Sequence, residues 1–240
     1  MVTTLTGVTE NLSHDSVESL SMEEHKNCVE LIGTYGSDEI HALSAWTSTS
    51  RDLPQEKRER IPQFIKMLVE NGHDTPFEKS SLHFLMTTDI ASHIHILRHR
   101  IGVSLNSASA RYKELKEDKF YVPFDWDDED RSAYEEFAKD CFKRYHASID
   151  RLVSKGYDRK RAKESSRFYL PYGMQYAIDV MFNFRSFVHF LKLRYSRDSQ
   201  EEVRAIARHM LQAVIDCGQF PHTLRAFDLV DVNGVIREPF

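Results

Sequence analysis

The stretch from Arg98 to Tyr112 limits what this chain can form more than any other part of the sequence. It reads Arg-His-Arg-Ile-Gly-Val-Ser-Leu-Asn-Ser-Ala-Ser-Ala-Arg-Tyr, so three arginines and a histidine are interleaved with three serines and an asparagine. Arginine presents a planar fork of donors that matches phosphate or carboxylate oxygens, and serine or asparagine can complete the shell without adding charge. We therefore predict that the fold uses this segment to hold a phosphate.

The composition requires any such basic site to be confined to a small part of the surface. The 240 residues include 32 basic and 37 acidic side chains, for a net charge of −5, so the whole surface does not attract nucleic acid or membranes. The three cysteines are far apart and odd in number, which gives neither a disulfide framework nor zinc-ligand spacing. No apolar run approaches the ~20 residues that span a bilayer. We expect a soluble, cytoplasmic protein without a membrane anchor.

Apolar periodicity divides the chain into helical and extended segments. Residues 1–20 show no sustained period, and we expect them to form a loose N-terminal arm. The longest helical stripe follows the acidic run Trp126–Asp130, whose charges suit the start of a helix. Strands are expected over 28–32, 78–88 and 173–182; helices over 38–50, 61–71, 90–100, 131–155, 159–163, 184–194 and 199–217; a loop over 104–109; and a hairpin or loop over 231–235.

The helix expected over 90–100 raises the question of a metal site. Its apolar stripe is predicted to be Ile90, Ile94, Leu97 and Ile101, which leaves His95 and His99 one turn apart on neighbouring faces. Such a pair could bind a metal, but no glutamate stands between the histidines and the flanking arginines would repel a cation. We predict no metal site.

Two other regions have chemistry that the residues alone leave open. His73 lies in a turn between an expected helix and strand, which could bring its ring to a site shared with residues 98–112. Asn183 is a good helix cap, and Arg185 and His189 follow it on a helix whose charged groups fit an ordinary solvated face equally well. The basic run 159–163 suggests a nucleic-acid patch, although it has no interleaved aromatic residues and is typical of a solvated helix face.

Taken together, the motifs resemble those of the flavin-dependent thymidylate synthases (the ThyX family). That family's signature, Arg-His-Arg, a Ser/Asn segment and Ser-x-Arg-Tyr, stands here as Arg98-His99-Arg100 … Ser104-x-Asn106-x-x-Ser109-x-Arg111-Tyr112. Three further segments occur in the family's order: Gly72 to Glu78, Arg167-x-x-Leu170-Pro171, and Asn183-x-Arg185-Ser186 continuing to Arg194. The resemblance covers about residues 28–227.

The resemblance implies an α+β fold with a central, mainly antiparallel sheet flanked by helices. It implies one domain over 21–240, assembled as a homotetramer with sites shared between subunits. The family makes dTMP from dUMP, taking the carbon from methylenetetrahydrofolate and the reducing equivalents from NADPH through bound FAD. We therefore expect a flavoprotein methyltransferase of nucleotide biosynthesis that has small-molecule substrates and binds no nucleic acid, membrane or metal.

By position, the resemblance also assigns residues to roles. FAD contacts are implied for His73, Thr75, Arg98, His99, Arg100, Asn106, Asn183, Arg185 and His189. Contacts with dUMP are implied for His95, Arg98, Ser107, Ser109, Arg111, Arg167 and Arg194. Arg194 is the implied catalytic residue: its guanidinium would face the uracil and favour the ionised ring, so that reduced flavin can deliver hydride.

Several positions depart from the family's pattern. His95 stands where a glutamine is common, His189 where an asparagine is common, and Ser107 where an acidic residue is common, and one residue is inserted around Val103. These changes surround the nucleotide and keep open a related flavin-dependent enzyme that alkylates C5 of UMP or another pyrimidine nucleotide. A binding module that holds nucleic acid through residues 98–111 and 159–163 is the second alternative; it would be colourless and strongly salt-dependent.

Overall fold

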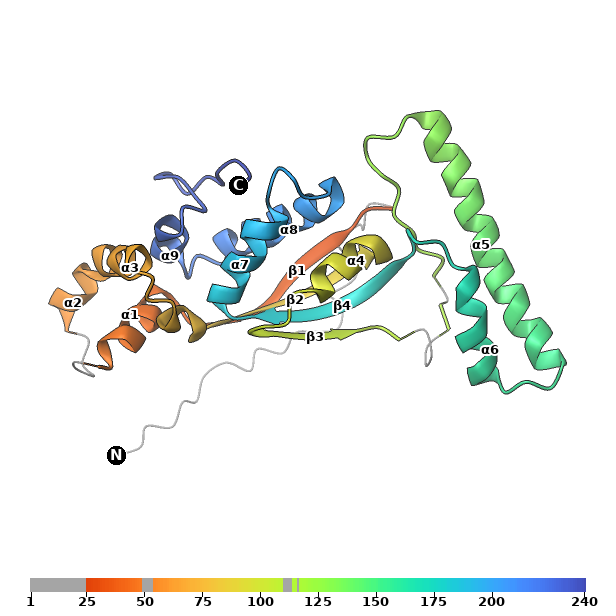
Figure 1. Ribbon diagram of the computed structural model, residues 1–240, viewed down its shortest axis with the longest axis horizontal. Coiled ribbons are helices and arrows are strands. Elements are labelled where there is room, and N and C mark those ends of the chain that lie inside the picture. The colour runs from red at the N-terminus through yellow and green to blue at the C-terminus, as the bar shows by residue number, and fades with distance from the viewer. Residues whose placement is uncertain (1–24, 49–53, 110–113, 116) are drawn as a thin grey trace, which may run out of the picture.

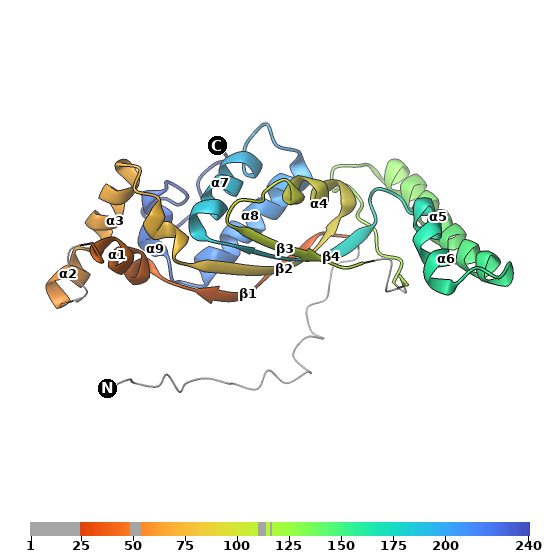
Figure 2. The same cartoon turned by 60° about the horizontal axis from the view of Figure 1, so that its bottom comes forward.

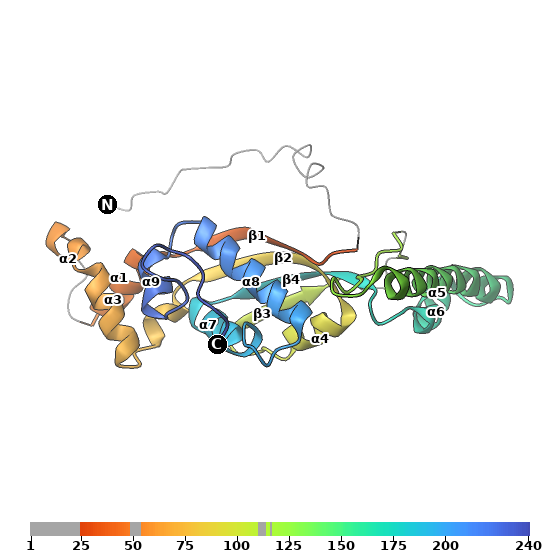
Figure 3. The same cartoon turned by 90° about the horizontal axis from the view of Figure 1, so that it is seen from above.

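The computed structural model describes residues 25–48, 54–109, 114–115 and 117–240. Within them, β1 (Cys28–Tyr35), β2 (Ser81–Asp89), β4 (Gln175–Phe182) and β3 (Val103–Ser107) form one sheet in that order. All three neighbouring pairs are antiparallel. Helices α4 (Ile90–Leu97), α7 (Phe184–Arg194) and α8 (Glu201–Asp216) cover one face of this sheet (Figures 2 and 3). The predicted α+β class and antiparallel sheet are confirmed.

The alternating pattern of β2 sets which face of the sheet is buried. Leu82, Phe84 and Met86 point into the main core, whereas Leu85 between them is 42% exposed, as the period-two pattern predicts. Residues Ile178, Val180 and Phe182 of the neighbouring β4 extend the same apolar layer. The layer is closed by the predicted stripes of α7 and α8, namely Phe187, Phe190, Leu191, Ile206, Met210, Leu211 and Val214.

The two ends of the sheet carry different helical units (Figure 1). Helices α1 (Asp38–Trp46), α2 (Gln55–Glu59), α3 (Ile61–Glu70) and α9 (Pro221–Ala226), with the short 3-10 helix η2 (Thr75–Glu78), lie at one end. Helices α5 (Asp128–Ser154) and α6 (Arg159–Ser166) form a hairpin at the other, followed by η3 (Arg167–Tyr169). The Asp127 carboxylate caps α5 by accepting a hydrogen bond from the amide of Asp130 at 2.9 Å.

The orientation of α4 differs from the prediction. The buried residues are Ser92, His93 and Ile96, while Ile101 of the predicted stripe is 90% exposed. The carboxylate of Asp89 caps the helix through the amide of Ser92 at 2.7 Å, directly after β2, so the strand sets how the helix is rotated. The helix also ends at Leu97 rather than at residue 100.

The prediction of a loop over 104–109 is wrong as well. Residues 103–107 form β3, because β4 supplies hydrogen-bond partners that the local sequence does not show. Helices α2 and α9 were not predicted, whereas the hairpin around 231–235 is confirmed by an antiparallel bridge between Val230 and Ile236. The predicted arm over 1–20 lies outside the described residues, and the single domain over 21–240 stays a prediction. Across the described ranges, no helix combines the length and apolar character needed to cross a membrane.

Candidate active site

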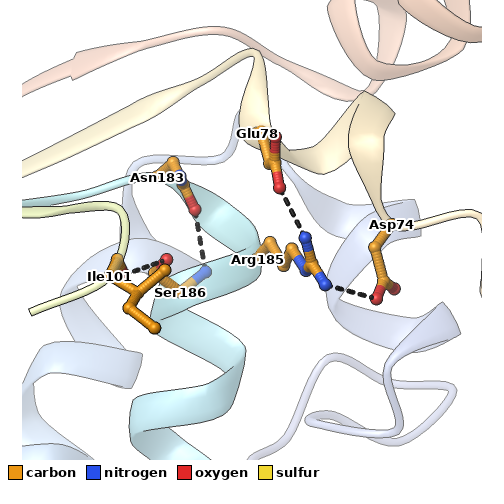
Figure 4. Close-up of polar contacts among 6 residues, drawn as sticks. All are labelled: Asp74, Glu78, Ile101, Asn183, Arg185 and Ser186. Carbon is orange, nitrogen blue, oxygen red and sulfur yellow. Dashed lines mark hydrogen bonds and ion pairs between the residues drawn. The ribbon is translucent and has the colours of Figure 1, made fainter. Parts of the chain in front are cut away.

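The segment after α4 is fixed against the start of α7. The Asn183 side chain accepts a hydrogen bond from the amide of Ser186 at 2.8 Å and caps α7, as predicted. The hydroxyl of Ser186 donates to the carbonyl of Ile101 at 2.7 Å (Figure 4). The backbone N–H of Asn183 donates to the carbonyl of Gly102 at 3.1 Å. Gly102 has a φ of +66°, and a Cβ there would collide with the side chains of Asn183 and Ser186. The turn that carries Arg98–Arg100 is therefore held on the first turn of α7.

Arg194, the last residue of α7, lies between two histidines of the α4 segment. Its Nε donates to Nε2 of His99 at 3.0 Å, and its NH1 group lies 3.4 Å from Nδ1 of His95. The ring of His99 is buried, packing edge-on against Phe190 at 5.0 Å and against His189 at 6.0 Å. The pair of histidines that could have held a metal instead contacts an arginine.

Burial and neighbouring cations favour the neutral form of His95 and His99. Burial, with Arg194 and His189 as further causes, lowers the pKa of His99 to about 4. Burial also lowers the pKa of His95, assisted by Arg194 and Arg98 and opposed by Asp89. Burial and Arg98 lower the pKa of Arg194 itself. The cluster therefore presents cationic guanidinium groups beside uncharged rings.

Arg185 contacts two carboxylates, whereas Arg194 contacts two histidines. Its guanidinium donates to the Glu78 carboxylate at 2.6 Å and lies 3.2 Å from the carboxylate of Asp74, both next to or within η2 (Figure 4). The hydrogen bond to Glu78 is the main cause that raises the pKa of Arg185, with Asp74 second. Asp74 and Glu78 are not among the predicted site residues, although both belong to the motif segment Gly72–Glu78. Only the distance between η2 and α7 in the fold could reveal the pairing.

Two adjoining cavities follow from this arrangement. A cavity of about 550 Å³ lies between η2 and the start of α7, and Asp74, Glu78, Asn183, Arg185 and Lys192 line it. A second cavity of about 290 Å³ is lined by the three residues of Arg98–Arg100 together with Arg194 and Val103. The two cavities share Ile101, Ser186 and His189 as walls.

The other predicted residues line separate cavities. Ser107, Ser109 and Arg167 line one of about 540 Å³, which is bounded by the Ile90–Ile94–Leu97 face of α4. His73 and Thr75 line one of about 500 Å³. Its walls include Trp46 and Phe64, which stack at 4.5 Å.

The structure therefore brings together only part of the predicted site within one chain. The residues gathered around the two adjoining cavities are His95, Arg98, His99, Arg100, Asn183, Arg185, His189 and Arg194. Asn106 lies on β3, where its side chain accepts a hydrogen bond from the amide of Ser107 at 3.0 Å. Arg111 lies outside the described residues. His93, which is not among the predicted site residues, lines the Arg167 cavity and keeps a buried, unpartnered Nδ1.

The chain is similar to known proteins over most of its length. A sequence model of the family described as "Thymidylate synthase complementing protein" matches residues 30–218. The flavin-dependent thymidylate synthase of Pseudothermotoga lettingae is 31% identical over 195 residues, which cover 77% of this chain and 83% of that protein. The one from Kosmotoga olearia is 28% identical, over 88% of this chain and 97% of its own length.

Among solved structures, the UMP/dUMP methylase PolB from Streptomyces cacaoi bound with 5-Br dUMP has a TM-score of 0.71 at 26% identity. The match covers 89% of this chain and 99% of that one. The family model spans more than half of this chain, and the Pseudothermotoga enzyme is similar over most of both sequences. The chain therefore belongs to the flavin-dependent thymidylate synthase family.

Proposed function

We propose that this protein methylates C5 of dUMP to give dTMP, with methylenetetrahydrofolate as carbon donor and NADPH as the reductant of bound FAD. The observation that carries the proposal is the set of arginines at the two adjoining cavities. Among the described residues, Arg98 and Arg100 form no ion pair with a carboxylate, in contrast to Arg185, which has two. Arginines without a carboxylate partner, next to neutral histidines, suit an anionic ligand.

The residues fit a flavin dinucleotide. The cavities of about 550 and 290 Å³ adjoin, and their shared wall is the turn held by Asn183 and Ser186 at the start of α7, where a helix favours negative charge. We assign Arg98 and Arg100 to the diphosphate of the cofactor, and Arg185, whose charge is balanced by Asp74 and Glu78, to its sugar. When bound and reduced, the flavin supplies the hydride; the chain's task is to orient it and hold charge around it.

The nucleotide is assigned to the Arg167 cavity. Ser107, Ser109 and Arg167 offer two hydroxyls and a cation, and no carboxylate among the described residues forms an ion pair with Arg167. This cavity shares no lining residue with the Arg98–Arg194 cavity, so within one chain the nucleotide groups and the flavin groups stay apart. A second copy that brings its Arg167 cavity to the first copy's Arg194 would complete a site.

Exposed apolar residues support such an assembly. Ile101, beside the Arg98–Arg194 cavity, is 90% exposed, and Phe168, beside Arg167, is 86% exposed. Large apolar side chains exposed next to functional cavities are typical of an interface. We therefore propose a homotetramer with shared sites, and a cytoplasmic location in keeping with three free cysteines. Light scattering should give the mass of four chains, and a monomer that turns over dUMP would contradict the shared site.

In this account Arg194 stabilises negative charge on the pyrimidine ring during hydride delivery. An arginine keeps its proton at neutral pH, and its two contacts with His95 and His99 fix the direction of the guanidinium. Fixed positive charge aimed at the atoms where negative charge develops lowers the barrier without reorganisation.

Substitution of Arg194 tests the assignment. Arg194→Ala should leave flavin bound but weaken dUMP binding by about 1.5–3 kcal/mol and remove most turnover, because a charge-assisted contact is lost. Arg194→Lys should recover only part, since an ammonium cannot reproduce the bidentate fork. Calorimetric titration of dUMP and flavin oxidation by dUMP with methylenetetrahydrofolate measure both effects. Arg197→Ala, an exposed arginine just beyond α7, is the matched control. Wild-type behaviour of Arg194→Ala would end this mechanism.

The absorbance spectrum of the purified protein separates this proposal from a nucleic-acid-binding module. We expect flavin bands in the wild type and their loss, or a need for much more added FAD, in Arg100→Ala. Arg208→Ala, on the exposed side of α8, should keep the bands. Colourless wild-type protein that added FAD cannot load, with RNA or DNA affinity that falls steeply with salt, would refute the enzyme proposal.

A second candidate reaction is methylation of UMP. The solved structure with a TM-score of 0.71 is described as a UMP/dUMP methylase, and His95 and Ser107 depart from the family's pattern around the nucleotide. Turnover of dUMP, UMP and dCMP should be compared under saturating FAD and methylenetetrahydrofolate, with the product mass determined for each. A kcat/KM higher for UMP than for dUMP would make the ribonucleotide the preferred substrate.

A further inference from the structure

His95 and His99 contact the guanidinium of Arg194 from two sides. These contacts require a particular protonation state of each imidazole ring. The guanidinium has only donors, so each imidazole nitrogen facing it must be an unprotonated acceptor. At His99 that nitrogen is Nε2, 3.0 Å from Nε of Arg194, so the ring proton is on Nδ1. At His95 it is Nδ1, 3.4 Å from NH1, so the ring proton is on Nε2.

Protonation of either ring would reverse the contact. The acceptor nitrogen would become a donor that faces a donor, and a second cation would lie next to the guanidinium. The guanidinium of Arg194, which sits at the end of a flexible aliphatic chain, would then turn away from the ring, because the like charges repel and the hydrogen bond is lost.

We propose that His95 is a positioning residue that holds Arg194 toward the nucleotide only while its imidazole is neutral, so that acid releases the arginine. This inference rests on the proposed role of Arg194 and adds a specific residue and a pH dependence to it.

The charges that surround His95 come from three elements. Arg98 is the C-cap of α4, Arg194 faces His95 from α7, and Asp89 ends β2 and caps the start of α4. His99 on the next turn and His189 on α7 complete the group of titratable neighbours. Burial and the two arginines lower the pKa of His95 and Asp89 opposes them, whereas His99 has a pKa of about 4. Because His99, with a pKa of about 4, stays neutral at ordinary assay pH, any protonation of a ring that contacts Arg194 in that range falls on His95.

Glutamine is the informative substitution, because its amide oxygen can accept from Arg194 but does not titrate. In the wild type, kcat/KM for dUMP should fall tenfold for each pH unit below the midpoint of His95. In His95→Gln, this acid limb should be absent until the pH approaches the range of His99. His95→Leu, which has no acceptor, should raise KM for the nucleotide at every pH, and glutamine should rescue that KM. His209→Gln, on α8, is the control and should keep the wild-type profile.

A readout independent of turnover is the NMR titration of the His95 ring, assigned by its loss in His95→Gln. In Arg194→Met the midpoint of His95 should rise, because a cation that lowers it has been removed. An unchanged midpoint in Arg194→Met, or the same acid limb in the wild type and His95→Gln, would overturn the inference. Absence of turnover with both dUMP and UMP would count against the proposed function, and the NMR titration would then decide the inference alone.

Discussion

The free energy of unfolding of this protein should fall in acid because of one fully buried histidine, and the size of the loss can be calculated. His41 on α1 is 0% exposed; its Nδ1 lies 3.0 Å from the Thr223 hydroxyl and its Nε2 3.0 Å from the Ser80 hydroxyl. The Thr223 hydroxyl donates to the Asp38 carboxylate at 2.6 Å and must therefore accept from His41. Nδ1 thus carries the ring proton, and Nε2 accepts from Ser80. The chain of hydrogen bonds links α1 and α9 to the segment that follows η2.

The magnitude follows from the pKa of His41, which burial lowers from 6.5 to about 4. Above pH 6.5 the ring is neutral in both the folded and unfolded states, so its titration does not change the free energy of unfolding. Between pH 6.5 and 4 only the unfolded chain binds the proton, so the free energy of unfolding falls as pH falls, by up to about 1.4 kcal/mol per pH unit. The loss should reach about 2 kcal/mol by pH 5 and about 3 kcal/mol below pH 4.

His41→Leu removes this titration together with two buried hydrogen bonds. At pH 7.5 we expect the variant to be less stable by about 2 kcal/mol, at roughly 1 kcal/mol per hydrogen bond. On acidification the wild type loses stability through His41 and the variant does not, so the difference should close near pH 5. Urea unfolding at fixed protein concentration measures it. Thr223→Val, which keeps the imidazole, is the control and should retain the wild-type slope. A difference between His41→Leu and wild type that stays constant from pH 7.5 to 5 would refute the reasoning.

Two further variants probe the site and the chemistry. Gly102→Ala forces a side chain into a turn at φ +66° and against α7, so urea unfolding should show a loss of about 1–3 kcal/mol, with weaker flavin retention after gel filtration; unaltered stability and colour would show that the turn is not held as described. The triple variant Cys28→Ala, Cys141→Ala and Cys217→Ala should still methylate dUMP, because burial raises the thiol pKa values of Cys141 and Cys217 and disfavours the nucleophilic thiolate. Complete loss of turnover in a folded triple variant would point to an enzyme thiol as nucleophile.

Local chemistry made part of this fold predictable from the sequence. The period-two pattern of β2, the stripe of α8 and the cap at Asn183 each depend on side chains within one element, and the structure reproduces all three. The antiparallel sheet was implied by the family resemblance, and it too is confirmed.

Contacts between distant segments account for the errors. The stripe from Ile90 to Ile101 is regular, yet α4 ends at Leu97 and buries a different face, so that Leu97 is exposed and Ile101 lies beyond the helix. Strand β3 looked like a loop because its hydrogen-bond partners belong to β4, far along the chain.

The candidate site shows the same limit. The family resemblance placed Arg98, His99 and Arg194 around the flavin and the nucleotide, and in the structure all three line one cavity, where Arg194 donates to His99. No local pattern could show that Arg167 and His73 line other cavities, or that Asp74 binds Arg185. Those facts depend on which faces of α4 and η2 the fold exposes.

The central claim is that this chain uses reduced flavin to methylate dUMP. The most direct test is a single-turnover experiment without oxygen, in which FAD-loaded protein is reduced with NADPH and mixed with dUMP and methylenetetrahydrofolate. Absorbance then follows the flavin while mass spectrometry follows the nucleotide. The account predicts that flavin is reoxidised only when both substrates are present and that dTMP appears in equal amount. Flavin that stays reduced with dUMP recovered unchanged would contradict it.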